Sequence, residues 1–217
     1  MNMTNPKRSG FTLIEMLMVI AIMGIVAAMV ISMAGAASNA RKKGMVDAER
    51  HRLMLAIDNY QSKLSFYPPD NGNIAAAAQT AVESYSRTNP LLYELTGAIP
   101  TNLGGNYIVN YGNGGTIQRI AFTNVFARGG IANSDAVEPQ NFFKPLPLPK
   151  DYTNYTAAYP SIFGLLVPVP VTNGQLNFWH YDSSSPYRHN PSTYDLWAEY
   201  SIGSKSGQLV IITNGNW

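Results

Sequence analysis

The sequence predicts an α+β protein in which one long amino-terminal helix precedes a small domain built on an antiparallel β-sheet. Three observations predict this fold class. Residues 11–37 are almost all apolar or small, and apolar residues then recur at helical spacing as far as Leu64. In the carboxy-terminal third, short apolar runs alternate with turn residues. Strands that follow helices in a block, rather than alternating with them, are typical of the α+β class.

The apolar segment at residues 11–37 predicts a membrane-spanning helix. It is longer than the roughly 20 residues that a helix needs to cross the hydrocarbon core of a bilayer. A secretory signal has a shorter apolar region that ends at a small-residue cleavage site, whereas this segment continues to the basic residues 41–43. Lys7 and Arg8 precede it. Basic residues therefore flank both ends, and the positive-inside rule leaves the orientation open.

An amphipathic helix is predicted to follow at residues 38–66. Its apolar stripe has the periodicity of one helix face and consists of Val46, Leu53, Ile57, Tyr60 and Leu64. The pattern ends at Tyr67-Pro68-Pro69, because proline cannot continue a helix. We therefore expect one continuous helix from Phe11 to about Leu64, whose stripe packs against a globular domain formed by residues 67–217.

Two short helices and two short strands are predicted in the first part of the globular domain. The helices are expected at residues 74–87, which are rich in alanine, and at residues 90–95. The strands are expected at residues 107–111 and 117–122, which lie next to glycine-rich turns.

The carboxy-terminal third predicts a small antiparallel sheet. Residues 165–171 and 176–181 flank Asn173-Gly174, and Asn-Gly between apolar runs is the strongest short hairpin signal. Two further strands are expected at residues 194–200 and 209–213. We expect this sheet to pack on the helical stripe.

Composition and charge exclude several classes of function. The 217-residue chain has a net charge of +2 and no cysteine. Disulfides and thiolate metal sites are therefore excluded, and no strong positive field predicts binding to nucleic acid. The sequence has neither a P-loop nor a convincing dinucleotide-binding fingerprint. We expect a protein that needs no cofactor and is not an enzyme.

The three histidines, His51, His180 and His189, do not predict a metal site. His180 and Asp182 lie near His189 in sequence, but their spacing matches no zinc-binding pattern. The segment is rich in serine and interrupted by proline, which predicts a surface loop.

Glu15 is the one charged residue among residues 11–37. A carboxylate at the centre of a membrane-spanning helix costs on the order of 3 kcal/mol on insertion scales, and less near an end, where Glu15 lies. Its side chain can reach the membrane surface, or it can pair with a positive charge on a neighbouring chain. The second interpretation has more weight, because ionisable residues inside a membrane are candidates for function.

The residues around Glu15 resemble a known family. Lys7-Arg8-Ser9-Gly10, followed by Phe11-Thr12-Leu13-Ile14-Glu15, is similar to the prepilin leader of type IV pilins and type II secretion pseudopilins. The likeness rests on a glycine before the cleavage point, a phenylalanine after it, a glutamate four residues later and a long apolar tail. It implies a pilin-like fold.

The resemblance implies a processing pathway. A prepilin peptidase would cut between Gly10 and Phe11, remove a leader formed by residues 1–10, and methylate the new amino group of Phe11. Gly10 would fit a tight protease pocket, and Lys7 and Arg8 would be the basic part of a leader that stays in the cytoplasm. The rest of the chain would cross the inner membrane once and place its globular domain in the periplasm.

The resemblance also implies partners. In a helical stack of identical subunits, Glu15 of one chain would meet the new amine at Phe11 of the next chain and set the axial register. Such a pair attracts strongly at low dielectric constant, where either charge alone is costly. The implied partners are prepilin peptidase, copies of the chain and other pilin-like subunits, an inner-membrane assembly platform and membrane lipid.

The carboxy-terminal residues resemble the end of major pseudopilins, on Tyr194-Asp195-Leu196-Trp197, Ile202-Gly203 and Asn214-Gly215-Asn216-Trp217. Such proteins commonly hold calcium in an aspartate-rich loop, whereas residues 203–217 contain no Asp or Glu. Calcium binds oxygen ligands that usually include carboxylates, so we expect no metal here. Packing of the apolar side chains is expected to hold the loop instead, through Val210, Ile211 and Ile212.

These observations favour a structural subunit of a pilus-like filament, and within that class a type II secretion pseudopilin. A type IV pilus pilin is the alternative within the class. The alternative outside the class is a membrane-anchored binding or enzymatic domain that forms no filament.

Overall fold

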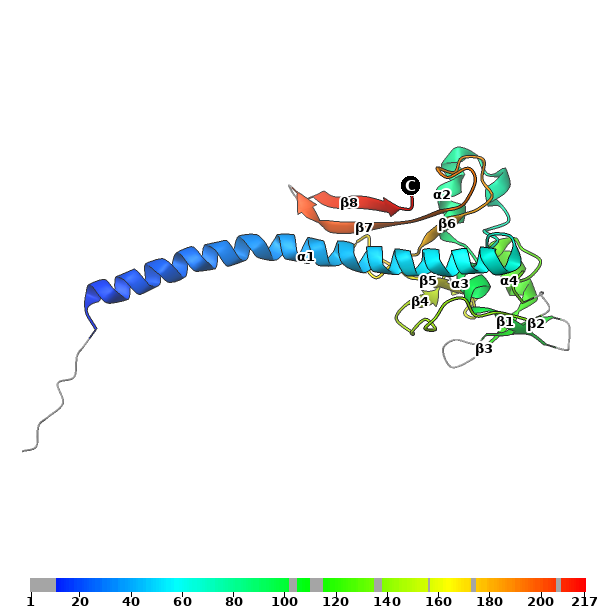
Figure 1. The fold of residues 1–217 in the computed structure, drawn as a ribbon, viewed down its shortest axis with the longest axis horizontal. Helices are drawn as coiled ribbons and strands as arrows, with labels where there is room; N and C mark the ends of the chain where they lie inside the picture. The colour runs from blue at the N-terminus through cyan, green and yellow to red at the C-terminus, as the bar shows by residue number, and fades with distance from the viewer. Residues whose placement is uncertain are drawn as a thin grey trace, which may run out of the picture. The chain divides into compact units, whose positions relative to one another are not determined.

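The computed structural model describes residues 11–101, 105–109, 115–134, 138–155, 157–172, 175–205 and 208–217. The side chains of residues 31, 32, 34, 204 and 205 are not among those described. The chain divides into two compact units, Met1–Arg41 and Lys42–Trp217. The fold is α+β, as the sequence predicts, with one long helix, several short helices and three small antiparallel sheets (Figure 1).

Helix α1, Leu13–Leu64, is a single helix of 52 residues, which confirms the prediction of one continuous helix. In the first unit, every side chain from residue 11 to residue 30 is exposed. A helix that is apolar all round is stable only when lipid or other helices cover it. In the monomer, neither lipid nor another helix covers this apolar part of α1.

The second part of α1 buries its apolar stripe, as predicted. Val46, Leu53, Ile57 and Tyr60 are fully buried and Leu64 is partly buried in the core of the second unit. Fully burying such side chains stabilises a fold by about 1.5 to 3 kcal/mol each. The helix ends where Ser65 adopts a left-handed backbone with φ of 68°, just before the two prolines.

Three antiparallel sheets share the core of the second unit. One contains β1 (Ala98–Pro100), β2 (Asn106–Val109) and β3 (Gly115–Gln118), in that order. The second pairs β4 (Tyr152–Asn154) with β5 (Phe163–Leu165). The third has the order β6 (His180–Asp182), β7 (Asp195–Lys205) and β8 (Gln208–Gly215).

The short helices differ in part from the predictions. Residues 74–87 divide into a 3-10 turn η1 (Ile74–Ala76) and helix α2 (Gln79–Arg87). Helix α3 (Leu91–Thr96) confirms the helix predicted at residues 90–95.

The strand predicted at residues 117–122 is wrong beyond Gln118. Strand β3 ends there, and helix α4, Arg119–Phe126, begins at the next residue. Phe122 and Phe126 are four residues apart, which places them on one helix face, and their ring centroids lie 4.8 Å apart in the core. Burial of both rings therefore favours the helix over a continued strand.

The hairpin predicted at residues 165–181 is reduced to one bridge. Leu166 pairs with Phe178, and the Val167 amide donates to the carbonyl of Asn177 at 2.8 Å. Pro168 and Pro170 have no N–H group, so the ladder cannot continue. The turn residues Asn173 and Gly174 lie outside the described residues.

The hairpin of β7 and β8 confirms the two last predicted strands. The packing predicted for residues 203–217 is only partly correct, because Val210 and Ile212 are half-buried but Ile211 is 48% exposed. Strand pairing holds this segment, together with a bond to the second part of α1, in which Asn214 Nδ2 donates to Asp47 Oδ1 at 2.8 Å. Just before the segment, Lys42 Nζ donates to the Ser201 carbonyl of β7 at 3.2 Å.

Candidate functional site

The candidate site is the amino-terminal end of α1, where Thr12 and Glu15 form a capping box. Thr12 precedes the first helical residue, and Glu15 is the third residue of the helix. The Thr12 amide and hydroxyl both donate to Glu15 Oε2 at 2.8 Å, and the Glu15 amide donates to Thr12 Oγ1 at 3.3 Å. These reciprocal bonds satisfy two of the amide groups that a helix start leaves without partners.

The capping box fixes the direction of the Glu15 carboxylate. The side chain folds back over the first turn toward the amide and hydroxyl of Thr12. Within the described residues, its side-chain hydrogen bonds all involve Oε2, so Oε1 remains available to another donor. The carboxylate is therefore oriented before any partner arrives.

Sequence reasoning found Glu15 but missed Thr12. The signal was present, because Thr12-Leu13-Ile14-Glu15 has the T-x-x-E spacing of a capping box. Phe11 lies immediately before the cap, and its side chain is 73% exposed. The predicted leader residues Lys7, Arg8 and Gly10 lie outside the described residues.

Comparison with protein families places this site in a known motif. Residues 5–31 match the prokaryotic N-terminal methylation motif. This motif is the prepilin-type leader of type IV pilin-like proteins. Comparisons with curated proteins and with solved structures gave no match.

The prepilin-type leader implies processing by a prepilin peptidase and pilin-like assembly in general. It also fits a protein of the inner membrane. Helix α1 is long and apolar enough to cross a bilayer, which is compatible with a single-pass anchor. The capping box lies inside the matched segment, so the oriented carboxylate is part of this motif.

Thr12→Ala is expected to loosen the first turn of α1. Loss of an N-cap side chain costs about 1 kcal/mol, which corresponds to about a fivefold larger population of the open turn. Hydrogen exchange of the Glu15 amide, followed by NMR on the full chain in detergent micelles, measures this opening. Thr12→Ser keeps the hydroxyl and should exchange like the wild type, whereas equal exchange in the alanine variant would contradict the capping role.

The surface loop that the sequence predicted for the histidine-containing segment is present at residues 183–194, where Tyr187 and His189 are exposed, but the residues before it are not part of that loop. His180 and Asp182 lie in strand β6 and are almost fully buried. The His180 ring stacks on Trp197 with centroids 4.8 Å apart, and its Nδ1 lies 3.0 Å from Ser86 Oγ. His180 of β6 is buried because it packs against Ser86 of α2, which lies 94 residues earlier in the chain. A contact between residues so far apart cannot be predicted from the local sequence. Among the described residues, no group of three His, Asp or Glu side chains could hold a metal ion.

Burial of His180 predicts a pH-dependent stability. Burial lowers the pKa of its imidazole from 6.5 to about 4. The unfolded chain therefore binds the proton more readily, and the free energy of unfolding falls as the pH drops from about 6.5 toward 4.

We expect the His180 contribution to fall by about 2 kcal/mol between pH 6.5 and pH 4.5. Urea unfolding followed by tryptophan fluorescence measures it. His180→Asn cannot titrate but can still bond to Ser86, so its loss of stability over this range should be smaller by that amount. The same loss in both proteins would contradict this assignment.

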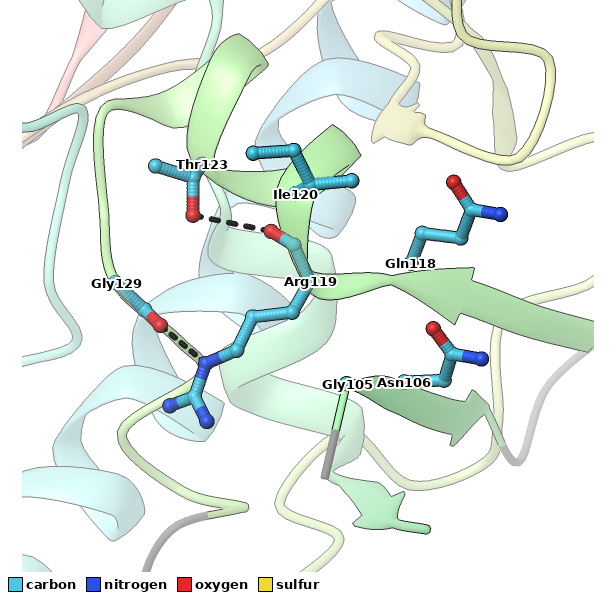
Figure 2. A pocket seen from close by; sticks show the side chains of 7 residues that line it. All are labelled: Gly105, Asn106, Gln118, Arg119, Ile120, Thr123 and Gly129. Atoms are coloured by element: carbon cyan, nitrogen blue, oxygen red, sulfur yellow. Dashed lines mark hydrogen bonds between the residues drawn. The ribbon is translucent and has the colours of Figure 1, made fainter. Parts of the chain in front are cut away.

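The pocket in Figure 2 offers no comparable candidate. It has a volume of about 440 Å³ and lies where β2, β3 and the start of α4 meet. Its one charged side chain, Arg119, donates to the Gly129 carbonyl and lies over the Tyr107 ring at 5.6 Å. The Thr123 hydroxyl donates to the Arg119 carbonyl at 3.0 Å (Figure 2). The bond to Gly129 connects α4 to the segment that follows it. Among the residues that line this pocket, no nucleophilic side chain lies beside a general base.

Proposed function

We propose that this chain is the precursor of a structural subunit of a pilus-like filament, specifically a type II secretion pseudopilin. Prepilin peptidase cuts it after Gly10 and methylates the amino group of Phe11. The mature subunit waits in the inner membrane with its globular unit in the periplasm, and it then enters a filament. The observation that supports this most strongly is the methylation motif at the start of a long apolar helix.

The exposed apolar part of α1 supports assembly into a helical bundle. Every side chain from residue 11 to residue 30 is exposed in the monomer. Lipid covers such a surface in the membrane, and the helices of neighbouring subunits can replace lipid in a filament. The work of extraction comes from an assembly ATPase outside this chain, since the sequence has no nucleotide-binding motif.

The capping box supports a role for Glu15 in setting the register. After cleavage, Phe11 bears a positive amino group next to the cap. In the bundle, the free Oε1 of Glu15 accepts a hydrogen bond from the Phe11 amine of a neighbouring subunit. A charge pair in such surroundings needs good geometry to outweigh its desolvation, and Thr12 supplies part of that geometry by holding Oε2.

Two features favour a secretion pseudopilin over a type IV pilus pilin. The carboxy-terminal residues 194–197 and 214–217 resemble those of major pseudopilins, and they lie at the base of β7 and the end of β8. The chain also has no cysteine and so no disulfide-closed loop. The role proposed is structural and not catalytic.

The mass and amino-terminal sequence of the protein purified from membranes test the proposal. A start at methylated Phe11 is expected. A start at Met1, in cells that contain the peptidase, would contradict it and favour a membrane-anchored domain without a filament. The chain is then expressed together with the assembly proteins of a type II secretion system, and separately with those of a type IV pilus. Only the matching assembly proteins should build filaments from it, which distinguishes the two kinds of filament.

A further inference from the structure

The second unit has an acidic cleft between α2 and the β7–β8 hairpin. The cleft has a volume of about 470 Å³, and its lining includes Glu83 of α2 and Glu199 of β7 together with the exposed rings of Tyr187 and Trp217. Asp182 and Asp195 also line the cleft, but backbone amides already bond to their carboxylates.

Glu83 and Glu199 are the carboxylates of the cleft that remain available. Within the described residues, neither side chain makes a hydrogen bond or an ion pair. Burial and the nearby charge of Glu83 both raise the pKa of Glu199, with burial the larger cause. The positive charge of Arg87 lowers the pKa of Glu199 by a smaller amount, while its guanidinium donates to the Leu176 carbonyl at 2.8 Å. The cleft therefore presents two carboxylates that form no direct ion pair among the described residues, and a cation from a partner would stabilise them further.

A basic groove lies on α1 and the segment at residues 140–144. It has a volume of about 420 Å³, and its charged lining residues are all basic: Arg52, Lys63 and Lys144. Arg52 is held by Glu49 at 3.3 Å and by the Phe143 ring at 4.0 Å. Lys63 and Lys144 are exposed and form no ion pair with the residues described. Leu55 adds an apolar side chain that is 63% exposed.

The acidic cleft and the basic groove are complementary in charge, and each also presents apolar surface. Carboxylates beside exposed aromatic rings form one surface, and ammonium groups beside an exposed leucine form the other. Aromatic faces attract cations as well as apolar side chains. Figure 1 shows α2 and the β7–β8 hairpin on one side of α1 and strands β1–β4 on the other. The surfaces also belong to different elements, since α2, β7 and β8 form the cleft and α1 forms the groove.

We propose that the acidic cleft of one subunit binds the basic groove of a second copy of this chain, with Lys63 and Lys144 facing Glu83 and Glu199. A contact between two different surfaces is heterologous, and repeated contacts of this kind build an open helical filament. The inference therefore rests on the proposed function and adds to it a periplasmic contact between globular units, separate from the contacts of the apolar helices.

Charge reversal tests the contact in the full-length protein, expressed with its assembly machinery. Lys63→Glu and Glu83→Lys should each lower the yield of sheared filaments at least about tenfold, because each variant places like charges opposite one another across the interface. The double variant that exchanges the two charges should regain most of the yield. Lys150→Glu and Glu138→Lys are matched controls, since both residues are exposed and line neither surface.

A second readout uses the absence of cysteine from the chain. Filaments of a variant with cysteine at both positions 63 and 83 should give a ladder of oligomers with a short bis-maleimide. Variants with one of the two cysteines should give no ladder. Unfolding followed by tryptophan fluorescence shows that each variant is folded, because residues 179, 197 and 217 all lie in the second unit.

The outcomes separate this inference from the proposed function. If wild-type filaments form and the reversals behave like the controls, or the exchange restores nothing and no ladder appears, the contact is wrong and the filament role stands. If the wild type is processed but forms no filament with either machinery, the proposed function fails, and this inference fails with it.

Discussion

Replacing Glu15 with alanine is expected to abolish filament assembly while leaving membrane insertion and leader cleavage largely intact. In the proposed filament, Glu15 faces the amine of Phe11 on a neighbouring subunit. Removing one partner of a buried ion pair costs about 3 to 5 kcal/mol, which is more than about a hundredfold in the association constant. The measurement is the yield of sheared filaments, beside the mass of the membrane-bound subunit.

Two further variants separate the charge of Glu15 from its role in the cap. Glu15→Gln keeps an oxygen that can accept from Thr12 but removes the charge, so its assembly should fail like that of the alanine variant. Thr12→Ala keeps the charge and loses only orientation, so its yield should fall less. Normal filament yield from Glu15→Ala would refute the registry role.

Replacing Glu94 with alanine is expected to produce the largest loss of stability in the globular unit. Glu94 of α3 is fully buried, and its carboxylate accepts three hydrogen bonds. The donors are the Tyr60 hydroxyl at 2.9 Å, the Ala132 amide at 2.8 Å and the Asn133 amide at 2.9 Å. Each buried donor left without a partner costs about 1 to 3 kcal/mol. We expect the free energy of unfolding to fall by about 3 to 5 kcal/mol, out of the roughly 5 to 15 typical of a domain.

Tyr60→Phe is the matched control, because it removes one of the three donors and leaves the carboxylate in place. Its cost should be about 1 to 2 kcal/mol. Burial raises the pKa of Glu94 to about 7, against the opposing hydrogen bonds from Asn133 and Ala132. Urea unfolding should therefore be compared at pH 8, where the carboxylate is mainly ionised. Equal stability of the Glu94→Ala variant and the wild type would show that the three bonds do not hold the unit together.

Periodicity predicted the elements that repeat over many residues. The apolar segment and the stripe from Val46 to Leu64 gave helix α1 and its buried face. The alternation at the carboxy terminus gave β7 and β8, although both extend beyond the predicted bounds. Periodicity failed over short segments. Residues 119–122 have the apolar composition of a strand, and only the joint burial of Phe122 and Phe126 makes them a helix.

The sequence likewise predicted only some of the functional and candidate residues. A single carboxylate in an apolar segment identified Glu15, and the residues before it identified the leader motif that the family comparison supports. Thr12 was overlooked even though its T-x-x-E spacing is local. The serines and proline after His180 are typical of loops, and residues 183–194 do form one. The burial of His180 itself was missed, because nothing in the local sequence reveals Ser86 or Trp197 as its partners.

The sequence by itself determined the prepilin-type leader and the membrane-length helix, because each depends on residues within one segment. Only the tertiary structure decided that Glu94 accepts a hydrogen bond from Tyr60, that His180 is buried against Ser86, and that the free carboxylates and the basic side chains form two separate surfaces. The two buried contacts join residues that are 34 and 94 positions apart. The physical reason is that burial and charge pairing depend on distance in space, and the packing of the whole unit sets that distance.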